Sequence, residues 1–232
     1  MGNQAMRLLS MLDVEVVTDG PHDVALWLSD NPQPDKRYIN SHILQLNKHS
    51  IGYTHGRAFG YEVDVDPQTY EGWVVMKSLR HNQHGKLIKC PVAHRPNAMK
   101  AYQRLLTNQS GPDGKMEELR AYIYGRDMLL MAKHLKVNEH GFSSAHRDGP
   151  YMIWQPEREL VSPDEKAQVL LLLLMLGVSY AAVDLIRDAD GRLYVIDVTL
   201  LMGVPERDWL SNCTQEQYLS DNAEMFQRTF LT

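Results

Sequence analysis

The amino-acid sequence predicts an α+β protein with antiparallel sheets. Two apolar strands, at residues 119–125 and 127–133, are joined by a tight connection at Gly125. A well-marked helix follows at residues 162–176, and a β-hairpin follows that helix at residues 183–199. Strand pairs that are neighbours along the chain, separated by a single helix, are the order of an α+β fold and not of repeated βαβ units.

Length and composition describe a folded chain without a strong charge bias. The 232 residues suffice for one large domain or two small ones, and 24 basic against 29 acidic side chains give a net charge of −5. We therefore expect no nucleic-acid partner and no membrane partner. No secretory signal is visible, and the longest apolar run, residues 169–178, is half of the ~20 residues that a membrane helix needs. With Cys90 and Cys213 as its only cysteines, the chain is expected to be cytoplasmic, with free thiols.

A short strand and a helix are predicted near the start of the chain. Residues 14–17 have the pattern of the strand. The helix begins at Asn47 and stops at Gly60. Two interior glycines, Gly52 and Gly56, weaken the helical pattern. The apolar face of this helix is predicted to carry Ile51, His55 and Phe59.

Two strands and a further helix are predicted next. The strands cover residues 72–77 and 87–90, and a polar loop separates them. A helix is predicted around residues 97–106. A loop rich in glycine, proline and aspartate follows at residues 107–115, before the strand pair described above.

The last two helices have clear ends. Ser162 is predicted to be an N-cap, with Glu165 completing a capping box, and Gly177 is predicted to end this helix. The final helix is predicted to start near Thr214 and to run to about Phe230.

The hairpin raises an electrostatic question. Asp190 and Gly191 suit a two-residue type I′ turn, because both central positions of that turn need a positive φ. With this turn, Asp184 lies directly opposite Asp197 on the neighbouring strand. Strand alternation then predicts one wholly apolar face and one face that is acidic away from the turn. The residues assigned to the apolar face are Val183, Leu185, Tyr194, Ile196 and Val198.

Two opposed carboxylates destabilise a sheet unless a cation compensates them. Cross-strand Cβ atoms are roughly 5 Å apart, so Asp184 and Asp197 can share a hard divalent cation. Magnesium suits such a pair because it usually takes one or two carboxylates together with phosphate oxygens. The residues alone leave a second interpretation open, in which both acids face water at a solvated edge of the sheet.

Lys77 and the loop after it form a second candidate. Lys77 ends the strand at residues 72–77, and the polar loop beyond it carries His81, Asn82 and His84. A lysine at this position can meet a phosphate and the loop can fold over it, whereas the alternative is a strand-end lysine that reaches solvent. His81 and His84 have the spacing of a metal pair, but no third zinc ligand is apparent nearby.

Together these segments resemble the motifs of the ATP-grasp superfamily, of the carboxylate–amine ligase type, from about residue 47 onward. GVSYAAVDLIRDADGRLYVIDVT has the family's spacing of an Asp and a second acid thirteen residues later, with Thr199 in place of the family's Asn. NKHSIGYTHGRAFGY resembles the first lysine at the head of a helix. GWVVMKSLRHNQHGK resembles the second lysine and its phosphate-covering loop. AYQRLLTN resembles the adenine-binding hinge, and EELRAYIYG resembles the acidic-x-Arg strand.

The resemblance implies an ATP-grasp fold, in which two α+β subdomains with antiparallel sheets hold a nucleotide between them. It implies a short N-terminal segment at 1–46, a first subdomain at 47–100, and a second at 101–232 with a metal-binding hairpin at 180–199. ATP and Mg²⁺ are the implied cofactors. The implied metal ligands are Asp184, Asp197 and Thr199. The implied nucleotide-binding residues are Lys48, Lys77, Asn82, His84, Gln103, Leu105 and Lys133. The implied catalytic residues are Lys77 and Arg120.

The activity that the resemblance implies is ATP-dependent ligation. A small-molecule or peptide carboxylate would be activated as an acyl phosphate, and an amine or another nucleophile would then attack it. Two alternatives are a kinase on the same scaffold and a nucleotide-binding module that has lost catalysis and serves a partner. Ala182, where many such ligases carry Arg, and Thr199 favour the last of these. The short N-terminal segment suggests that a homodimer mate or a partner protein completes the site.

Overall fold

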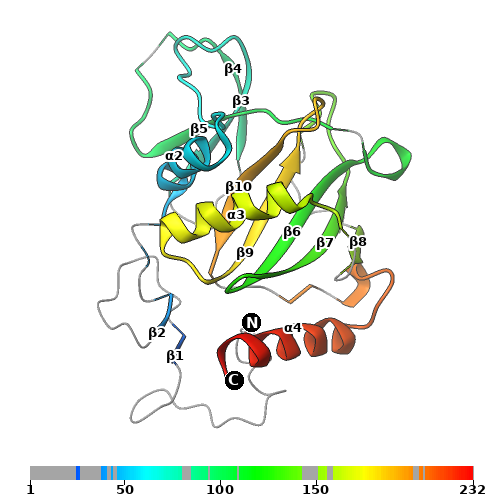
Figure 1. Ribbon diagram of the computed structural model, residues 1–232. Helices are drawn as coiled ribbons and strands as arrows, with labels where there is room; N and C mark the ends of the chain where they lie inside the picture. Colours follow the sequence, from blue (N-terminus) through cyan, green and yellow to red (C-terminus); the bar gives the residue numbers. More distant parts are fainter. Residues whose placement is uncertain are drawn as a thin grey trace.

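The computed structural model describes residues 25–26, 38–40, 43, 46–79, 85–93, 95–108, 110–142, 151–155, 159–200, 204–205 and 207–231 (Figure 1). The α+β class with antiparallel sheets is confirmed. The small sheet, in the order β4-β3-β5, contains β3 (Gly72–Ser78), β4 (Lys86–Cys90) and β5 (Lys100–Arg104). The large sheet, in the order β10-β9-β6-β7-β8, contains β6 (Met116–Tyr124), β7 (Asp127–Leu135), β8 (Tyr151–Trp154), β9 (Tyr180–Arg187) and β10 (Leu193–Thr199).

Three α-helices accompany the sheets in the described part of the chain: α2 (Lys48–Phe59), α3 (Pro163–Leu176) and α4 (Gln215–Phe230). Short elements complete the set: a parallel pair, β1 (Ala25–Leu26) and β2 (Tyr38–Ile39), and two 3₁₀ turns, η1 (Pro112–Gly114) and η2 (Arg207–Trp209). None of these helices has the length and apolar composition that a bilayer-crossing segment needs. The strand predicted at residues 14–17 lies outside the described residues.

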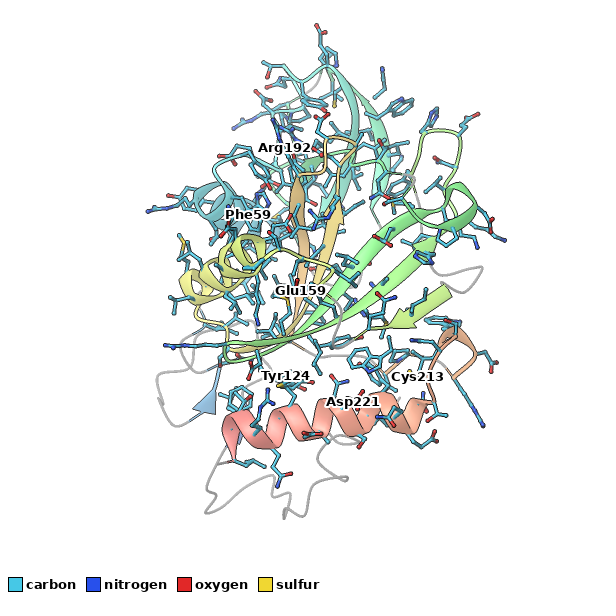
Figure 2. The ribbon with its side chains drawn as sticks, turned by 45° about the vertical axis from the view of Figure 1, so that its right-hand side comes forward. Phe59, Tyr124, Glu159, Arg192, Cys213 and Asp221 are labelled. Atoms are coloured by element: carbon cyan, nitrogen blue, oxygen red, sulfur yellow. The ribbon has the colours of Figure 1, made fainter. Side chains whose placement is uncertain are left out.

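Each face of the large sheet packs against a helix (Figure 1). In β6, Leu119 and Ala121 belong to the core that α3 covers, whereas Tyr122 and Tyr124 belong to an aromatic cluster under α4. Figure 2 shows Tyr124 on the side of the sheet that faces α4. Its hydroxyl donates a hydrogen bond of 2.6 Å to Asn222 of that helix. Because strand side chains alternate, the face under α4 is also the face that carries Glu118 and Arg120 of β6.

The helix limits that the sequence predicts are confirmed. Asn47 caps α2, where its side chain accepts hydrogen bonds from two backbone amides, and Gly60 ends the helix with φ of 79°. The predicted apolar face of α2 is buried. For α3, Ser162 and Glu165 form the predicted capping box, and Gly177 ends the helix with φ of 72°.

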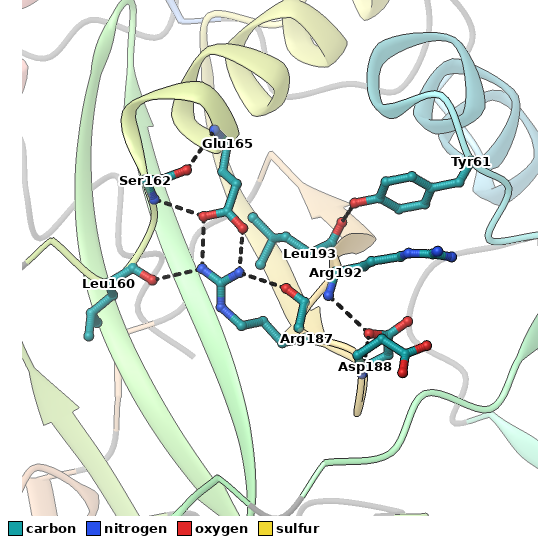
Figure 3. A network of polar contacts seen from close by, with 10 residues as sticks. Tyr61, Leu160, Ser162, Glu165, Arg187, Asp188, Arg192 and Leu193 are labelled. Carbon is teal, nitrogen blue, oxygen red and sulfur yellow. Dashed lines mark hydrogen bonds and ion pairs between the residues drawn. The ribbon is translucent and has the colours of Figure 1, made fainter.

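Arg187 ties the start of α3 to the end of β9. Its guanidinium forms an ion pair with Glu165 and donates a hydrogen bond of 3.1 Å to the carbonyl of Leu160 (Figure 3). On the other side of the hairpin, the Tyr61 hydroxyl donates a hydrogen bond of 2.6 Å to the carbonyl of Leu193. These contacts fix the hairpin against α3 and against the segment that follows α2.

The helix predicted around residues 97–106 is wrong, because residues Lys100–Arg104 form strand β5. β5 pairs with β3, with Gln103 opposite Val75 and Ala101 opposite Lys77. Apolar residues recur there at helical spacing, but hydrogen bonding of the backbone to β3 overrides this local pattern. β5 also spans the predicted subdomain boundary between residues 100 and 101.

The hairpin turn differs from the prediction, although the acid pair does not. The Asp188 amide donates to the Arg192 carbonyl, and φ is positive at Gly191, so the loop is one residue longer than a two-residue turn. Leu185 therefore lies opposite Val195. A β-bulge between Val195 and Asp197 then shifts the register by one residue.

This bulge restores the predicted pairing of Asp184 with Asp197. The prediction for the apolar face of the hairpin is wrong for the residues next to the turn, because the longer turn shifts their register by one residue. Leu193 and Val195, and not Tyr194 and Ile196, belong with Val183 and Leu185 in the core under α3. Tyr194 and Ile196 belong to a separate cluster at the turn end of the opposite face.

Candidate functional site

A row of charged side chains crosses three neighbouring strands of the large sheet. Asp184 on β9 lies between Asp197 on β10 and Arg120 on β6. Residues that oppose one another in antiparallel strands project to the same face, so this row lies on one side of the sheet. It is the side whose far end is covered by α4.

Arg120 and Lys133 hold the central carboxylate of this row. Nε and Nη2 of Arg120 donate hydrogen bonds of 2.8 and 2.9 Å to the two oxygens of Asp184. Lys133 on β7 donates a third, of 2.9 Å, and it also forms an ion pair with Glu118 on β6. Burial raises the pKa of Asp184, but the two cations outweigh burial and hold that pKa well below its usual range.

Lys48 pairs with the outer acid of the row. It stands at the start of α2 and forms an ion pair with Asp197, although its own side chain is only 6% exposed. Asp197 also accepts a hydrogen bond of 2.8 Å from the amide of Val198, and its side chain remains 30% exposed. Of the two acids, Asp197 is therefore the more open to solvent and to a ligand.

Lys77 reaches the same place from the small sheet. Its Nζ donates a hydrogen bond of 3.2 Å to the carbonyl of Ile196, the residue in the β-bulge. Burial and the neighbouring charge of Lys48 lower the pKa of Lys77 to about 8, although Asp197 and other acids oppose that shift. The structure thus brings Lys48, Lys77, Arg120 and Lys133 together at the two predicted metal-binding acids.

The remaining predicted residues have different positions. Gln103 is buried in β5, and Leu105 follows that strand and donates its amide to the carbonyl of Trp73. Thr199 lies opposite Ala182, two residues along each strand from the paired acids. Asn82 and His84 lie outside the described residues.

Two acids of this region were not among the predicted site residues, although Glu118 is the acid of the acidic-x-Arg motif. Glu118 could have been found from strand alternation, because it stands two residues before Arg120 on the same face of β6. Asp64 could not. It comes between α2 and β3 along the chain, where its carboxylate lies so close to Gly52 that a Cβ atom at that glycine would overlap it. A side chain at position 52 would therefore displace this carboxylate.

Replacing Asp64 with asparagine is expected to stabilise the protein at neutral pH. Burial raises the pKa of this carboxyl to about 6, although Gln103, His49 and Lys77 oppose the shift. A raised carboxyl pKa means that stability falls as the pH rises from about 4 to about 6, because the folded state resists ionisation. Because Asp64 is partly exposed, we expect the variant to gain only about 1–2 kcal/mol in its free energy of unfolding above pH 6. This gain over the wild type is expected to vanish near pH 4.

Urea unfolding at pH 7.5 and pH 4 measures this difference. Glu62→Gln is the control, because Glu62 is an exposed acid in the same segment and packs beside Gly56. A gain of equal size at both pH values would contradict the assignment.

The donor set of the site suits magnesium only in combination with phosphate. Within the residues described, no group of three or more His, Cys, Asp and Glu side chains could hold a metal ion. Asp184 and Asp197 supply two carboxylates, which is the usual protein share for Mg²⁺ when phosphate oxygens complete the shell. The four cations beside them match the charge of a polyphosphate.

Solved structures of similar fold include an ATP-grasp ligase, PsnB. In complex with a minimal precursor it superposes with a TM-score of 0.51 at 14% sequence identity, over 75% of this chain and 60% of PsnB. In complex with a minimal precursor, Mg and ADP the TM-score is 0.50 at 13% identity, over 82% and 62%. The D-cycloserine synthetase DcsG has a TM-score of 0.48 at 14% identity, over 78% and 70%. This chain thus spans about 60% of the length of PsnB. Neither a protein-family model nor a curated protein matches the sequence.

Proposed function

We propose that this chain, which has the ATP-grasp fold, is an ATP- and Mg²⁺-dependent ligase that activates a carboxylate for attack by an amine. The observation that carries the proposal is the convergence of four cations on two opposed acids. Lys48 from α2, Lys77 from the small sheet, and Arg120 and Lys133 from the large sheet all lie at this one place. A polyphosphate and its metal are the ligand that such a charge pattern fits.

In the proposed reaction the protein positions and neutralises charge. Lys48 and Lys77 hold the phosphates, and Arg120 and Lys133 stabilise the negative charge on the transferring phosphoryl group. Magnesium bound by Asp184 and Asp197 would supply further neutralisation of the phosphate oxygens. The γ-phosphoryl group passes to a carboxylate oxygen and ADP leaves. The amine then attacks the carbonyl carbon, loses a proton, and displaces phosphate.

The small sheet would supply the nucleoside side of the site. Gln103 and Leu105 are proposed to contact adenine, and the loop that contains Asn82 and His84 is proposed to cover the phosphates. Gln103 lies opposite Val75, two residues before Lys77 on the same strand. This spacing supports a nucleotide that lies along β3, with its phosphates at Lys77.

The carboxylate and amine substrates are proposed to be small molecules or peptides. PsnB, which was solved with a minimal precursor, supports a substrate of the second kind. A homodimer mate or a partner protein is proposed to supply further substrate contacts. A screen of amine and carboxylate pairs for ADP release, with product masses as the readout, tests the activity.

The same screen separates the two rival functions. A kinase would release ADP with a hydroxyl acceptor and without any amine. A module without catalysis would bind ATP and release no ADP, and Ala182 opposite Thr199 is the feature that favours it. Catalysis is preferred over a binding module because Arg120 and Lys133 lie next to the acids, where they would stabilise the charge of a transferring phosphoryl group. The fold shared with PsnB, an ATP-grasp ligase, supports a ligase over a kinase.

Replacing Lys77 with alanine is expected to weaken ATP binding and to leave adenosine binding unchanged. A charge-assisted hydrogen bond contributes roughly 1.5–3 kcal/mol, so the loss for ATP is about tenfold or more. Calorimetry with both ligands measures it, and Lys89→Ala on the neighbouring strand is the control, because Lys89 is exposed. Equal losses for ATP and adenosine would show a folding defect instead, and no loss would remove Lys77 from the site.

A further inference from the structure

Asp64 and Gln103 form a second polar pair at the edge of the small sheet. They oppose each other in an isolated antiparallel bridge. Hydrogen bonds flank the pair on both sides, from the Val65 amide to Tyr102 at 2.8 Å and from the Arg104 amide to Val63 at 3.0 Å. In a pair of this kind the two residues do not exchange backbone hydrogen bonds, and their side chains lie close together.

α2 contacts this pair at Gly52, where the helix has no side chain. The carboxylate of Asp64 lies against Gly52, and Lys48 stands one helical turn before that glycine. On the other side, Gln103 lies opposite Val75, two residues before Lys77. The pair therefore lies near both proposed phosphate-binding lysines, Lys48 and Lys77. It lies on the side of Lys77 that is toward the predicted adenine-binding hinge at residues 101–108.

Three polar atoms of this pair are buried without a partner. Oδ1 of Asp64 and both Oε1 and Nε2 of Gln103 make no hydrogen bond with any residue that the structure describes. The Gln103 amide is close enough to lower the pKa of the Asp64 carboxyl, but no bond of good geometry joins the two side chains. Buried polar groups in native proteins are almost always satisfied, so three such atoms in one place indicate a ligand.

We infer that Asp64, together with Gln103, binds a neutral hydrogen-bond donor on the nucleoside half of the nucleotide. The inference rests on the proposed function, which places phosphates at Lys48 and Lys77. A carboxylate accepts hydrogen bonds and repels phosphate, so the phosphates themselves cannot be its partner. The nucleoside carries two groups of the required chemistry, the amino group of adenine and the ribose hydroxyls.

Such a carboxylate makes the site selective. A site with a buried acceptor rejects an analogue that lacks the matching donor, because the acceptor is then left unpaired. ITP replaces the amino group with a carbonyl oxygen, which would face the carboxylate as a second acceptor. The two deoxy analogues, 2′-dATP and 3′-dATP, each lack one ribose hydroxyl.

Calorimetric affinities for ATP, ITP and the two deoxy analogues test the inference. The wild type is expected to prefer ATP over at least one analogue by about tenfold or more, and Asp64→Ala is expected to bring that ratio close to one. Loss of the preference over ITP identifies the base, and loss of the preference over a deoxy analogue identifies the ribose. Asp64→Asn, which keeps the side-chain size, serves if the alanine variant does not fold.

Glu62→Ala is the matched control, because it removes the same charge from the same segment and beside the other interior glycine of α2. Its affinity ratios are expected to equal those of the wild type. An Asp64 variant that weakens all four nucleotides equally, or none of them, would overturn the inference and leave the proposed function standing. A wild type that binds none of the four would overturn both.

Discussion

Replacing Asp184 with asparagine is expected to lower the free energy of unfolding by about 3 kcal/mol, because the buried Lys133 and the half-buried Arg120 then lose the carboxylate that they share. Arg120 and Lys133 donate three hydrogen bonds to this carboxylate, and the Lys133 side chain is only 7% exposed. From the sequence alone the opposite result follows, since removing one of two opposed acids would relieve a repulsion. The structure reverses that expectation because the repulsion between the acids is already compensated.

Urea unfolding of the protein without nucleotide measures the change, and Asp190→Asn in the exposed turn of the same hairpin is the control. The pKa of Asp184 lies well below its usual range, so its contribution is fully present above about pH 4 and is lost only at more acidic pH. The double variant with Arg120→Met is expected to recover part of the loss, because the one ion pair that Arg120 makes with a described residue is with Asp184, whereas Lys133 keeps Glu118. An Asp184→Asn variant as stable as the control would contradict the role of this network.

Magnesium is expected to raise the affinity for ATP by about ten- to a hundredfold, which corresponds to roughly 1.4–2.7 kcal/mol. Without a metal, ATP must take Lys48 from Asp197, and it must share Arg120 and Lys133 with Asp184. Two carboxylates are then left beside a polyanion. A divalent cation removes that penalty, because it binds the acids and the phosphates at once.

The Asp197→Asn variant is expected to lose most of this magnesium effect, and in EDTA it is expected to bind ATP more tightly than the wild type, because Lys48 is then no longer paired with a carboxylate. Titration calorimetry with and without Mg²⁺ separates the two quantities, and a thermal scan of the free variant checks its folding. Asp190→Asn again serves as the control, and it is expected to behave as the wild type. Equal affinities of the wild type in Mg²⁺ and in EDTA would remove the metal from the proposal.

The features that the sequence predicted correctly depend on residues within a few positions of one another. The ends of α2 and α3 follow from Asn47, Gly60, Ser162 and Gly177, whose side chains or φ angles satisfy the nearest backbone groups. The strands predicted at 119–125 and 127–133 are confirmed within β6 and β7, apart from Gly125, because these two strands pair with each other across a short connection. The pairing of Asp184 with Asp197 was also predicted, although a longer turn and a compensating bulge produce it.

The features decided by the tertiary structure depend on contacts between segments that are distant in the chain. β5 is a strand because β3 pairs with it, and the local pattern of residues 97–106 could not reveal that pairing. Arg120 and Lys133 neutralise Asp184 from 64 and 51 residues away. Asp64 approaches α2 at Gly52 from the segment that follows the helix. By itself the sequence determined the helices, most of the strands and the candidate charged residues, since these depend on local hydrogen bonding and side-chain periodicity. The ion pairs among these charged residues depend on how the two sheets and α2 pack together. They could not be predicted from the sequence, because ion pairing depends on distances between segments that are far apart in the chain.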